Sequence, residues 1–195
     1  GNLPAAELKP LVEKYLGALP STSDREKWID RGVRPLRGHQ ECEIEFMGLP
    51  SSIVVLSMTR EMDYNIRHNI CLEALKSILQ TRCMNVIREK EGGTYAVNVN
   101  QGVVYEPVAQ YSMIVEFQCD PLNAAKLKGI VYGELERLRQ QVPSRDELMM
   151  ALNSIRKKEG EARESNVYWQ EKLVLYYRTG LNQADVREFE EIVDK

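Results

Sequence analysis

The residues best suited to chemistry lie in one short segment, where Arg88 and Tyr95 flank the pair Gly92-Gly93. Arginine is a fixed, always-charged fork of donors, and tyrosine is a neutral donor with a high pKa. Such a pair can hold a peptide carbonyl and stabilise the oxyanion that forms on nucleophilic attack. The alternative is a surface arginine and a strand tyrosine packed at a sheet edge. The spacing alone favours this alternative.

The two histidines do not have the spacing of a zinc site. His39 and His68 form neither H-E-x-x-H nor the inverted H-x-x-E-H, in which two imidazoles one helical turn apart face the metal beside a glutamate. We therefore expect no metal ligand and no zinc in this domain. His68 is expected on a helix surface or partly buried.

Cysteine chemistry is a further alternative, because each histidine precedes a cysteine by three positions. The chain has four cysteines: Cys42, Cys71, Cys83 and Cys119. Working Cys–His pairs normally come from distant segments, so this proximity is weak support for a thiol hydrolase. Without a C-x-x-C pair, buried free thiols are the expected state. The sequence also contains no G-x-S-x-G and no phosphate-binding P-loop.

Composition excludes several classes of protein. The chain has 195 residues, of which 43% are hydrophobic and 28% charged, and its formal net charge is -3. A nucleic-acid-binding protein normally needs a basic face, which this balance argues against. The longest apolar run, 53–56, is too short to span a bilayer, and residues 1–4 do not begin a signal peptide. The compartment stays unknown, since the bacterial periplasm and the cytoplasm are both compatible.

Apolar periodicity and turn residues predict the elements that must position Arg88 and Tyr95. In chain order we expect a helix over 4–19, a linker over 21–37, strands over 43–46 and 52–59, of which the second is central, and a helix from an Asp63 cap to about 88. Strands over 94–105 and 110–119 and a helix over 120–141 follow. The chain then continues with a helix that begins at a Ser144–Glu147 capping box and is weakened at Gly160, a helix over 167–177, and a last helix over 181–193 with Asn182 as its cap.

This order predicts an α+β fold, a largely antiparallel sheet with helices packed on one face. Strand alternation places Tyr95, Val97 and Val99 on one strand face. Their sheet should also contain residues 53–58 and 110–119. No internal repeat is found.

Three segments together resemble one peptidase family. The stretch Arg88-Glu89-Lys90-x-Gly92-x-x-Tyr95, between a long helix and an alternating strand, resembles the arginine-to-tyrosine segment in the C-terminal half of pitrilysin/insulysin-type inverzincin metallopeptidases. Residues 1–20 are similar to the segment that closes the preceding domain in that family. Residues 142–148 are similar to its "v-t-e-e-E-L" helix start. The likeness spans nearly the whole chain and keeps its order.

The resemblance implies a metalloenzyme half-domain of the LuxS/processing-peptidase-like type. Residues 1–37 would be the end of a preceding domain with its linker, and residues 38–195 a substrate-positioning domain. Zinc would lie in a partner N-terminal domain, in the same chain or in another subunit, and the two halves would clamp an unfolded peptide. Arg88 and Tyr95 would bind substrate near the scissile bond. No catalytic residue is expected in this chain alone.

Two functions therefore stay open. One is the zinc-lacking half of a zinc endopeptidase, which would be inactive by itself because it lacks H-x-x-E-H. The other is a structural or assembly domain of the same fold, like the non-peptidase core subunits of respiratory complexes. The presence of both Arg88 and Tyr95 favours the first, because a purely structural domain needs neither.

Overall fold

The computed structural model describes residues 3–21, 28–45, 48, 51–91, 96–180 and 189–193, with the backbone alone over 88–91. The chain divides into two compact units, Gly1–Val33 and Arg34–Lys195. The predicted domain boundary after residue 37 concerns a longer protein and stays a prediction.

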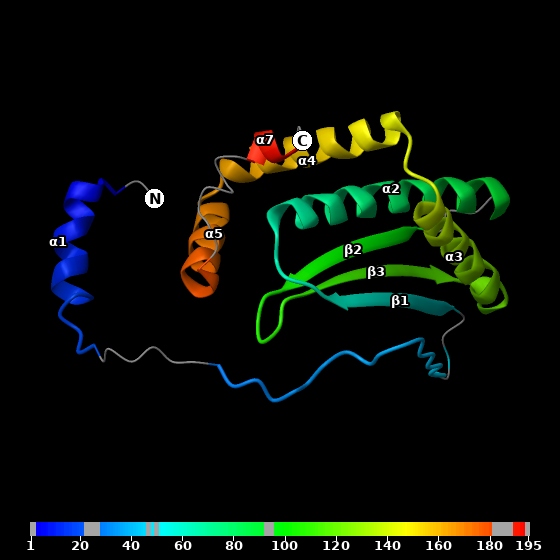
Figure 1. Ribbon diagram of the computed structural model, residues 1–195, viewed down its shortest axis with the longest axis horizontal. Coiled ribbons are helices and arrows are strands. Elements are labelled where there is room, and N and C mark those ends of the chain that lie inside the picture. The colour runs from blue at the N-terminus through cyan, green and yellow to red at the C-terminus, as the bar shows by residue number, and fades with distance from the viewer. Residues whose placement is uncertain are drawn as a thin grey trace. The chain divides into compact units, whose positions relative to one another are not determined.

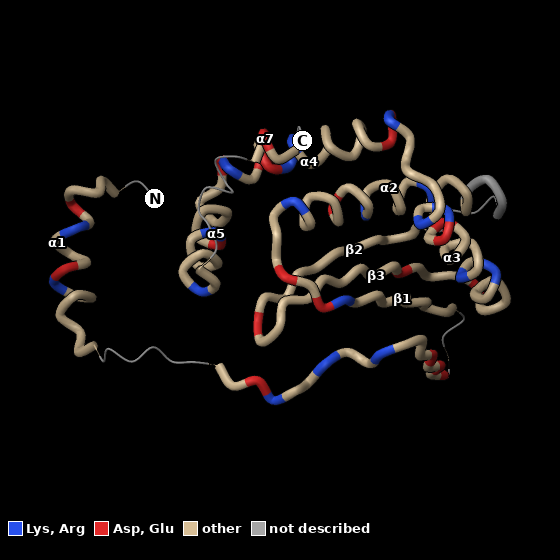
Figure 2. The backbone as a smooth tube through the Cα atoms, viewed as in Figure 1, with Lys and Arg blue, Asp and Glu red and all other residues tan. Residues whose placement is uncertain are grey.

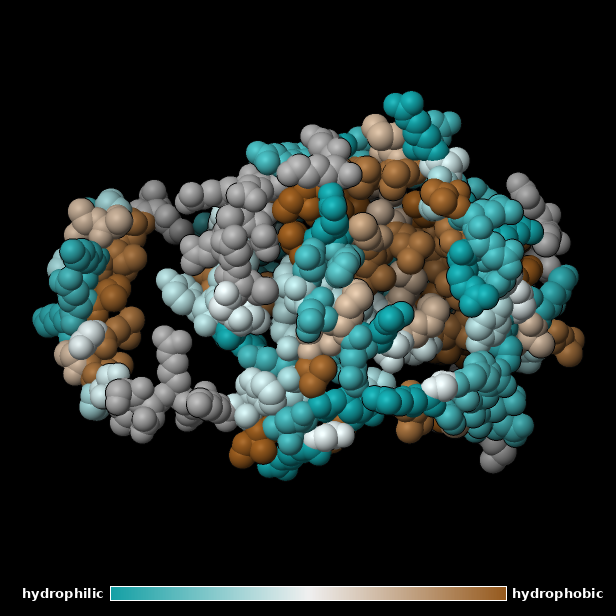
Figure 3. Space-filling view, in the orientation of Figure 1, coloured by the Kyte–Doolittle hydropathy of each residue, from teal (hydrophilic) through white to brown (hydrophobic). Residues whose placement is uncertain are grey.

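In the smaller unit the structure describes one helix, α1, over Ala5–Tyr15. The predicted helix was longer, but the helical pattern ends at Tyr15, shortly before Gly17 and Pro20. No described residue of α1 is buried. Its apolar residues include Leu8, Leu11 and Val12, which are all exposed. Figure 3 shows hydrophobic colouring along one side of this helix.

A three-stranded antiparallel sheet is the centre of the larger unit (Figure 1). Its strands are β1 (Ser52–Glu61), β2 (Val97–Val104) and β3 (Gln110–Cys119), in the spatial order β1-β3-β2. Each neighbour pairs with β3 along its whole length, from Ser52 opposite Cys119 and from Val97 opposite Phe117. The predicted strand over 110–119 is confirmed.

Two strand predictions are wrong for the described residues. Residues 43–45 form no strand, because an alternating sequence becomes a strand only where a neighbour accepts its backbone hydrogen bonds. The second error concerns β1, which was predicted to be the central strand. In the structure β1 is an edge strand and β3 is the central strand. Every second residue of β1 is exposed to solvent; Ile53 is 64% exposed and Val55 is 55% exposed. An apolar run therefore did not require burial on both faces.

Helices cover one face of the sheet, which confirms the α+β prediction. The long helix α2 (Ile66–Glu91) runs alongside the strands, and α3 (Ala124–Gln140) follows a short 3-10 turn, η1 (Pro121–Asn123) (Figure 1). The core between helices and sheet consists of these buried residues: Leu79, Cys83, Ile87, Val97, Val99, Met113, Val115, Phe117, Cys119, Leu127 and Val131.

The structure confirms one predicted helix cap and corrects another. Ser144 and Glu147 form the predicted capping box at the start of α4 (Arg145–Arg163), and Asp120 caps η1. At the start of α2, however, Asn65 Oδ1 accepts the hydrogen bond from Arg67 N at 2.8 Å. Asn65, rather than Asp63, is the cap, since it directly precedes the first helical residue.

Helix α4 and the last helix, α7 (Phe189–Val193), form a second hydrophobic cluster with α2. Helix α4 passes Gly160 without interruption, and a new helix, α5, spans Asn166–Thr179. Gly180 ends α5 in the left-handed conformation, at φ 69°. The predicted cap of the last helix, Asn182, lies outside the described residues. None of the described helices is long and apolar enough to cross a membrane.

Candidate functional site

The segment that contains Arg88 and Tyr95 joins the end of α2 to the start of β2. Arg88 lies in the last turn of α2, where the backbone is described but its side chain is not. Tyr95 lies outside the described residues, two positions before Val97. The structure therefore does not test whether the two side chains meet, and their pairing stays a prediction. The shared face is confirmed for Val97 and Val99, which are both buried.

The two elements that bracket this segment are firmly fixed. Ile87, which precedes Arg88, is fully buried in the core that also holds Val97. The Val97 backbone N–H donates to Met84 Sδ at 3.3 Å, which ties the start of β2 to α2. The Val99 N–H donates to Gln80 Oε1 at 3.4 Å. Side chains of α2 thus occupy backbone donors at the start of β2 and hold both ends of the predicted site.

The second feature is the sheet face opposite α2 and α3, which we call the open face. Alternation along the strands and the strand register define its residues: Ile53, Val55, Ser57 and Thr59 of β1, Ser112, Ile114, Glu116 and Gln118 of β3, and Asn98, Asn100 and Gly102 of β2. Figure 2 shows that most of the three strands carry no charge. The open face is therefore a mainly polar, uncharged surface with an apolar side along β1.

The strand register sets rows of neighbours across the open face. Glu116 lies in the central strand, opposite Val55 on one side and Asn98 on the other. Two rows further along β3, Ser112 lies opposite Gly102, and the Ser112 hydroxyl donates a hydrogen bond to the Gly102 carbonyl at 3.4 Å. A Cβ at residue 102 would stand 3.1 Å from Ser112 Oγ, so a larger residue at this position would crowd the serine hydroxyl.

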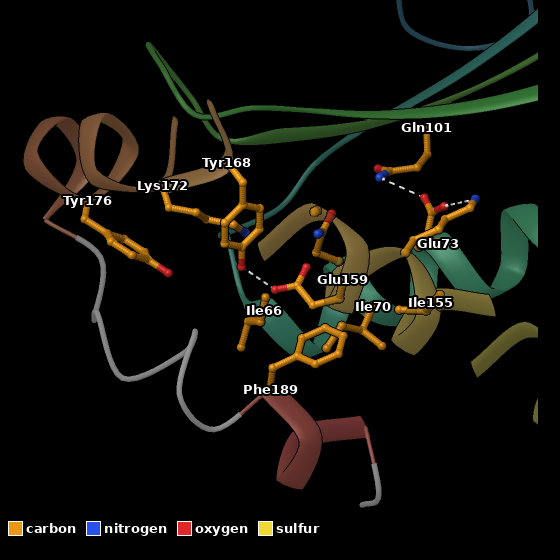
Figure 4. Close-up of a pocket in the computed structure, with 13 residues that line it drawn as sticks. Ile66, Ile70, Glu73, Gln101, Ile155, Glu159, Tyr168, Lys172, Tyr176 and Phe189 are labelled. Carbon is orange, nitrogen blue, oxygen red and sulfur yellow. Dashed lines mark hydrogen bonds and ion pairs between the residues drawn. The ribbon is translucent and has the colours of Figure 1, made fainter. Parts of the chain in front are cut away.

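A pocket of about 340 Å³ lies on the helical side, between α2, α4, α5, α7 and the end of β2 (Figure 4). Its apolar wall includes Ile66, Ile70, Ile155 and Phe189. Its polar groups are largely paired with one another. Gln101 donates to Glu73 at 3.2 Å.

A tyrosine and a glutamate face each other in this pocket. The Tyr168 hydroxyl donates to Glu159, and the Lys172 ammonium lies 5.4 Å from the Tyr168 ring centroid. Burial, together with the Glu159 carboxylate, raises the pKa of Tyr168 to about 12. The phenol is therefore a donor and stays protonated at neutral pH. Two oxygens at the pocket, Asn69 Oδ1 and Gln101 Oε1, are buried without a hydrogen-bond partner.

The cysteines and histidines form no nucleophilic pair in the described residues. Cys83 and Cys119 are buried, as expected, whereas Cys42 and Cys71 are exposed, which corrects the prediction of four buried thiols. Burial raises the pKa of the Cys83 thiol to about 12, so it is inert as a nucleophile.

His39 binds a carboxylate rather than a thiol: its Nε2 lies 3.1 Å from Glu41 Oε1. His68 is exposed on α2, as predicted. Among the residues with described positions, no three His, Cys, Asp or Glu side chains are grouped so that they could hold a metal ion.

Sequence analysis missed both the pocket and Glu116. The pocket draws on four helices and a strand, and no local pattern predicts how helices pack. A signal for Glu116 did exist. Alternation along the predicted strand 110–119 places Glu116 on the face opposite its apolar neighbours Val115 and Phe117, where a carboxylate is solvated.

Comparison with known proteins identifies the family. Residues 1–155 match the model described as the peptidase M16 inactive domain. A curated relative from Arabidopsis thaliana, a "Zinc protease PQQL-like" protein, is 20% identical over 208 residues, which covers 95% of this chain and 21% of the relative. The chain thus spans about a fifth of the length of that relative.

Solved structures share the fold at low sequence identity. The periplasmic protease PqqL from Escherichia coli matches with a TM-score of 0.79 and 19% identity, over 100% of this chain and 21% of PqqL. The ferredoxin protease FusC, solved as a mutant in complex with Arabidopsis ferredoxin, matches with a TM-score of 0.76 and 16% identity over the same shares.

A predicted insulinase family protease from Yersinia pestis matches with a TM-score of 0.71 and 11% identity, over 98% of this chain and 43% of that one. The resemblance to pitrilysin/insulysin-type peptidases is confirmed, because the family model covers most of the chain. The chain belongs to the M16 peptidase family, in which it corresponds to the inactive domain.

Proposed function

We propose that this chain is the zinc-lacking half of a zinc metalloendopeptidase. It binds extended peptide and helps to stabilise the transition state in trans to an N-terminal domain that holds the zinc. The observation that carries the proposal is the match to the inactive domain of a zinc peptidase family, in a chain that keeps the Arg88-to-Tyr95 segment between α2 and β2.

The proposed roles follow from donor chemistry. Arg88 supplies a permanent positive charge and Tyr95 a neutral hydroxyl, and both suit a carbonyl oxygen that gains negative charge during attack. The buried Ile87 and Val97 hold the two ends of the segment, which limits where its side chains can go. A donor that is positioned before the reaction costs no reorganisation when charge develops.

The names of the similar structures support a polypeptide substrate. PqqL and FusC are described as proteases, and FusC is in complex with a protein, ferredoxin. In this proposal the partner is the zinc-bearing domain and the ligand is a peptide. The chain itself supplies neither zinc nor the attacking water.

The test uses the complete peptidase, that is, this chain together with its zinc-bearing half. We expect Arg88→Ala and Tyr95→Phe each to lower kcat by about 10²–10³, the usual cost of one lost oxyanion donor. Stability should change by less than roughly 0.5 kcal/mol, because this proposal has both side chains face the peptide rather than the core. Steady-state peptide cleavage and thermal melting measure the two effects separately.

Tyr105→Phe is a matched control, because Tyr105 is a tyrosine just after β2 that packs against the Tyr64 ring, with centroids 5.0 Å apart. Its kcat should stay at the wild-type level. Wild-type turnover in Tyr95→Phe would exclude the phenol as a donor. A large drop in the melting temperature of both site variants would instead mean that Arg88 and Tyr95 belong to the core.

A structural or assembly role is the second candidate, and one observation favours it. Helix α5 exposes a set of large apolar side chains: Val167, Trp169, Leu173, Val174 and Tyr177. Contiguous exposed apolar residues commonly mark a protein interface. This role predicts that the Arg88 and Tyr95 variants keep full function in the assembled protein, which the kinetic test above detects.

A further inference from the structure

We propose that Glu116 on the open face selects a basic side chain in the bound peptide, with an apolar side chain two residues away from it. This inference rests on the proposed function and names the substrate class for it. It arises from the charge and spacing of β3 and its neighbours, independently of Arg88 and Tyr95.

Glu116 is an exposed charge among uncharged neighbours. Its row contains Val55 and Asn98, and the next open-face residue of β3 is Ile114. Glu61, the last residue of β1, is a second carboxylate at the border of the open face, and its Oε1 lies 3.6 Å from Arg34 Nε. Within the part of the chain that the structure describes, no lysine or arginine forms an ion pair with Glu116. The complementary ligand group is an ammonium or guanidinium.

The spacing along β3 matches that of an extended peptide. Glu116 and Ile114 are two residues apart on one strand face, which corresponds to about 6.6–6.8 Å. An extended ligand that follows β3 also places every second side chain on one side, at the same interval. A basic residue over Glu116 therefore brings the residue two positions away over Ile114. The sequence preference is basic-x-apolar, in either chain direction.

Val55 strengthens this preference for a long basic side chain. It lies beside Glu116 and is 55% exposed. Lysine and arginine can lay their methylene stems on apolar surface while the charged end reaches a carboxylate. A short cation would satisfy Glu116 but leave Val55 in water.

The ligand is expected to lie on the face of the sheet rather than extend it at β2. The Val97 and Val99 N–H groups already donate to Met84 and Gln80 of α2. A new strand at this position would have to displace both contacts. A nucleic acid does not fit the open face, because its phosphates would meet an unpaired carboxylate.

Binding of matched peptides to this 195-residue chain tests the inference. The probes are three fluorescent nine-residue peptides, identical except for Arg, Gln or Glu at the centre, with Leu two positions later. Fluorescence anisotropy gives each Kd. We expect the Arg peptide to bind about threefold tighter than the Gln peptide, as for an exposed ion pair, and the Glu peptide to bind weakest.

Charge variants make the assignment specific. Glu116→Gln should remove the preference while all three peptides still bind, and Glu116→Lys should reverse it. Glu171→Gln, a change of equal charge at an exposed residue of α5, should leave the preference intact. The preference should also shrink at about 1 M salt, where the Debye length falls to about 3 Å. Amide spectra of each variant check that the fold is kept.

The outcomes separate this inference from the function on which it rests. Equal binding of the three peptides to the wild-type chain would overturn the role of Glu116 and leave the peptide-binding function standing. Absence of binding by any peptide would instead count against the proposed function. A preference that survives in Glu116→Gln would place the selecting carboxylate elsewhere.

Discussion

A two-point ion pair between Arg82 of α2 and Glu147 of α4 holds the two helices together. Arg82 Nε donates to Glu147 Oε1 at 2.6 Å, and Arg82 Nη2 donates to Oε2 at 2.9 Å. The Ser144 backbone N–H also donates to Oε2, at 2.8 Å. The Arg82 guanidinium is the main cause that lowers the pKa of Glu147 to about 2, and the Ser144 N–H adds to it.

This lowered pKa predicts how stability depends on pH. The Glu147 pKa is about 2 in the folded state and has the ordinary value of 4.5 in the unfolded state, so the unfolded chain binds the proton first. The stabilisation is fully present above pH 4.5 and is lost as the pH falls from there towards 2. We expect Glu147→Gln to lower the free energy of unfolding at pH 7 by about 1–2 kcal/mol, as for a partly exposed, two-point pair.

Urea denaturation at pH 7, 5 and 3 measures this difference. It should be the same at pH 7 and 5 and smaller at pH 3. Glu161→Gln serves as control, because its exposed pair with Lys157 has a separation of 3.8 Å. That change should stay within about 0.5 kcal/mol at every pH. A Glu147→Gln effect that is constant down to pH 3 would contradict the assigned pKa.

Local and distant contacts of one residue differ in how far the sequence predicts them. The Ser144–Glu147 capping box follows from two residue types three positions apart, and the structure confirms it. Arg82 is 65 positions from Glu147, and only helix packing brings the two together. The same limit applies to the Arg88–Tyr95 pair, which remains untested although its two types are plain in the sequence.

Among the elements, α3 covers the sheet with a few fully buried side chains. Leu127 is 0% exposed and lies in the core with Val131. We expect Leu127→Ala to lower the free energy of unfolding by about 2–5 kcal/mol, because it removes buried apolar contacts and leaves a cavity.

Leu122 offers a matched control for this change. It precedes α3 in the turn η1 and is 91% exposed, so Leu122→Ala should cost less than about 0.5 kcal/mol. Chemical denaturation of both variants gives the comparison. Equal losses would mean that α3 does not cover the sheet as described.

The success of an element prediction depended on whether its environment could be inferred. The predicted bounds of β3 are correct, because alternation from Tyr111 to Cys119 matches a strand with one buried face. The sequence around 43–45 alternates equally well, yet those residues form no strand. Alternation reports suitability for a sheet, whereas a partner strand decides whether the sheet includes the segment.

Zinc content tests the whole molecule. The described part of the chain contains no cluster of metal ligands, and the family model is that of an inactive domain. We expect the purified, untagged chain to contain well under one equivalent of zinc, since stable zinc sites need three or four well-placed ligands. Elemental analysis after dialysis measures this. One equivalent held by His39 or His68 would overturn the assignment.

The α+β class and the helix-covered sheet could be predicted from the order of elements. The open face could not be recognised as a site, because its residues come from three strands whose register is a property of the fold. The family resemblance supplied roles for Arg88 and Tyr95 that their spacing alone did not support.

The two strands that pair with β3 lie at very different distances from it along the sequence. Strand β2 returns to it through residues 105–109, whereas β1 is separated from it by residues 62–109. The second connection is about ten times longer, so its closure costs about 2 kcal/mol more entropy than that of the hairpin. The hairpin of β2 and β3 is the local half of the sheet, because its two strands are joined by the shorter connection. Loop entropy therefore favours assembly in which β1, and with it Val55, joins the open face last.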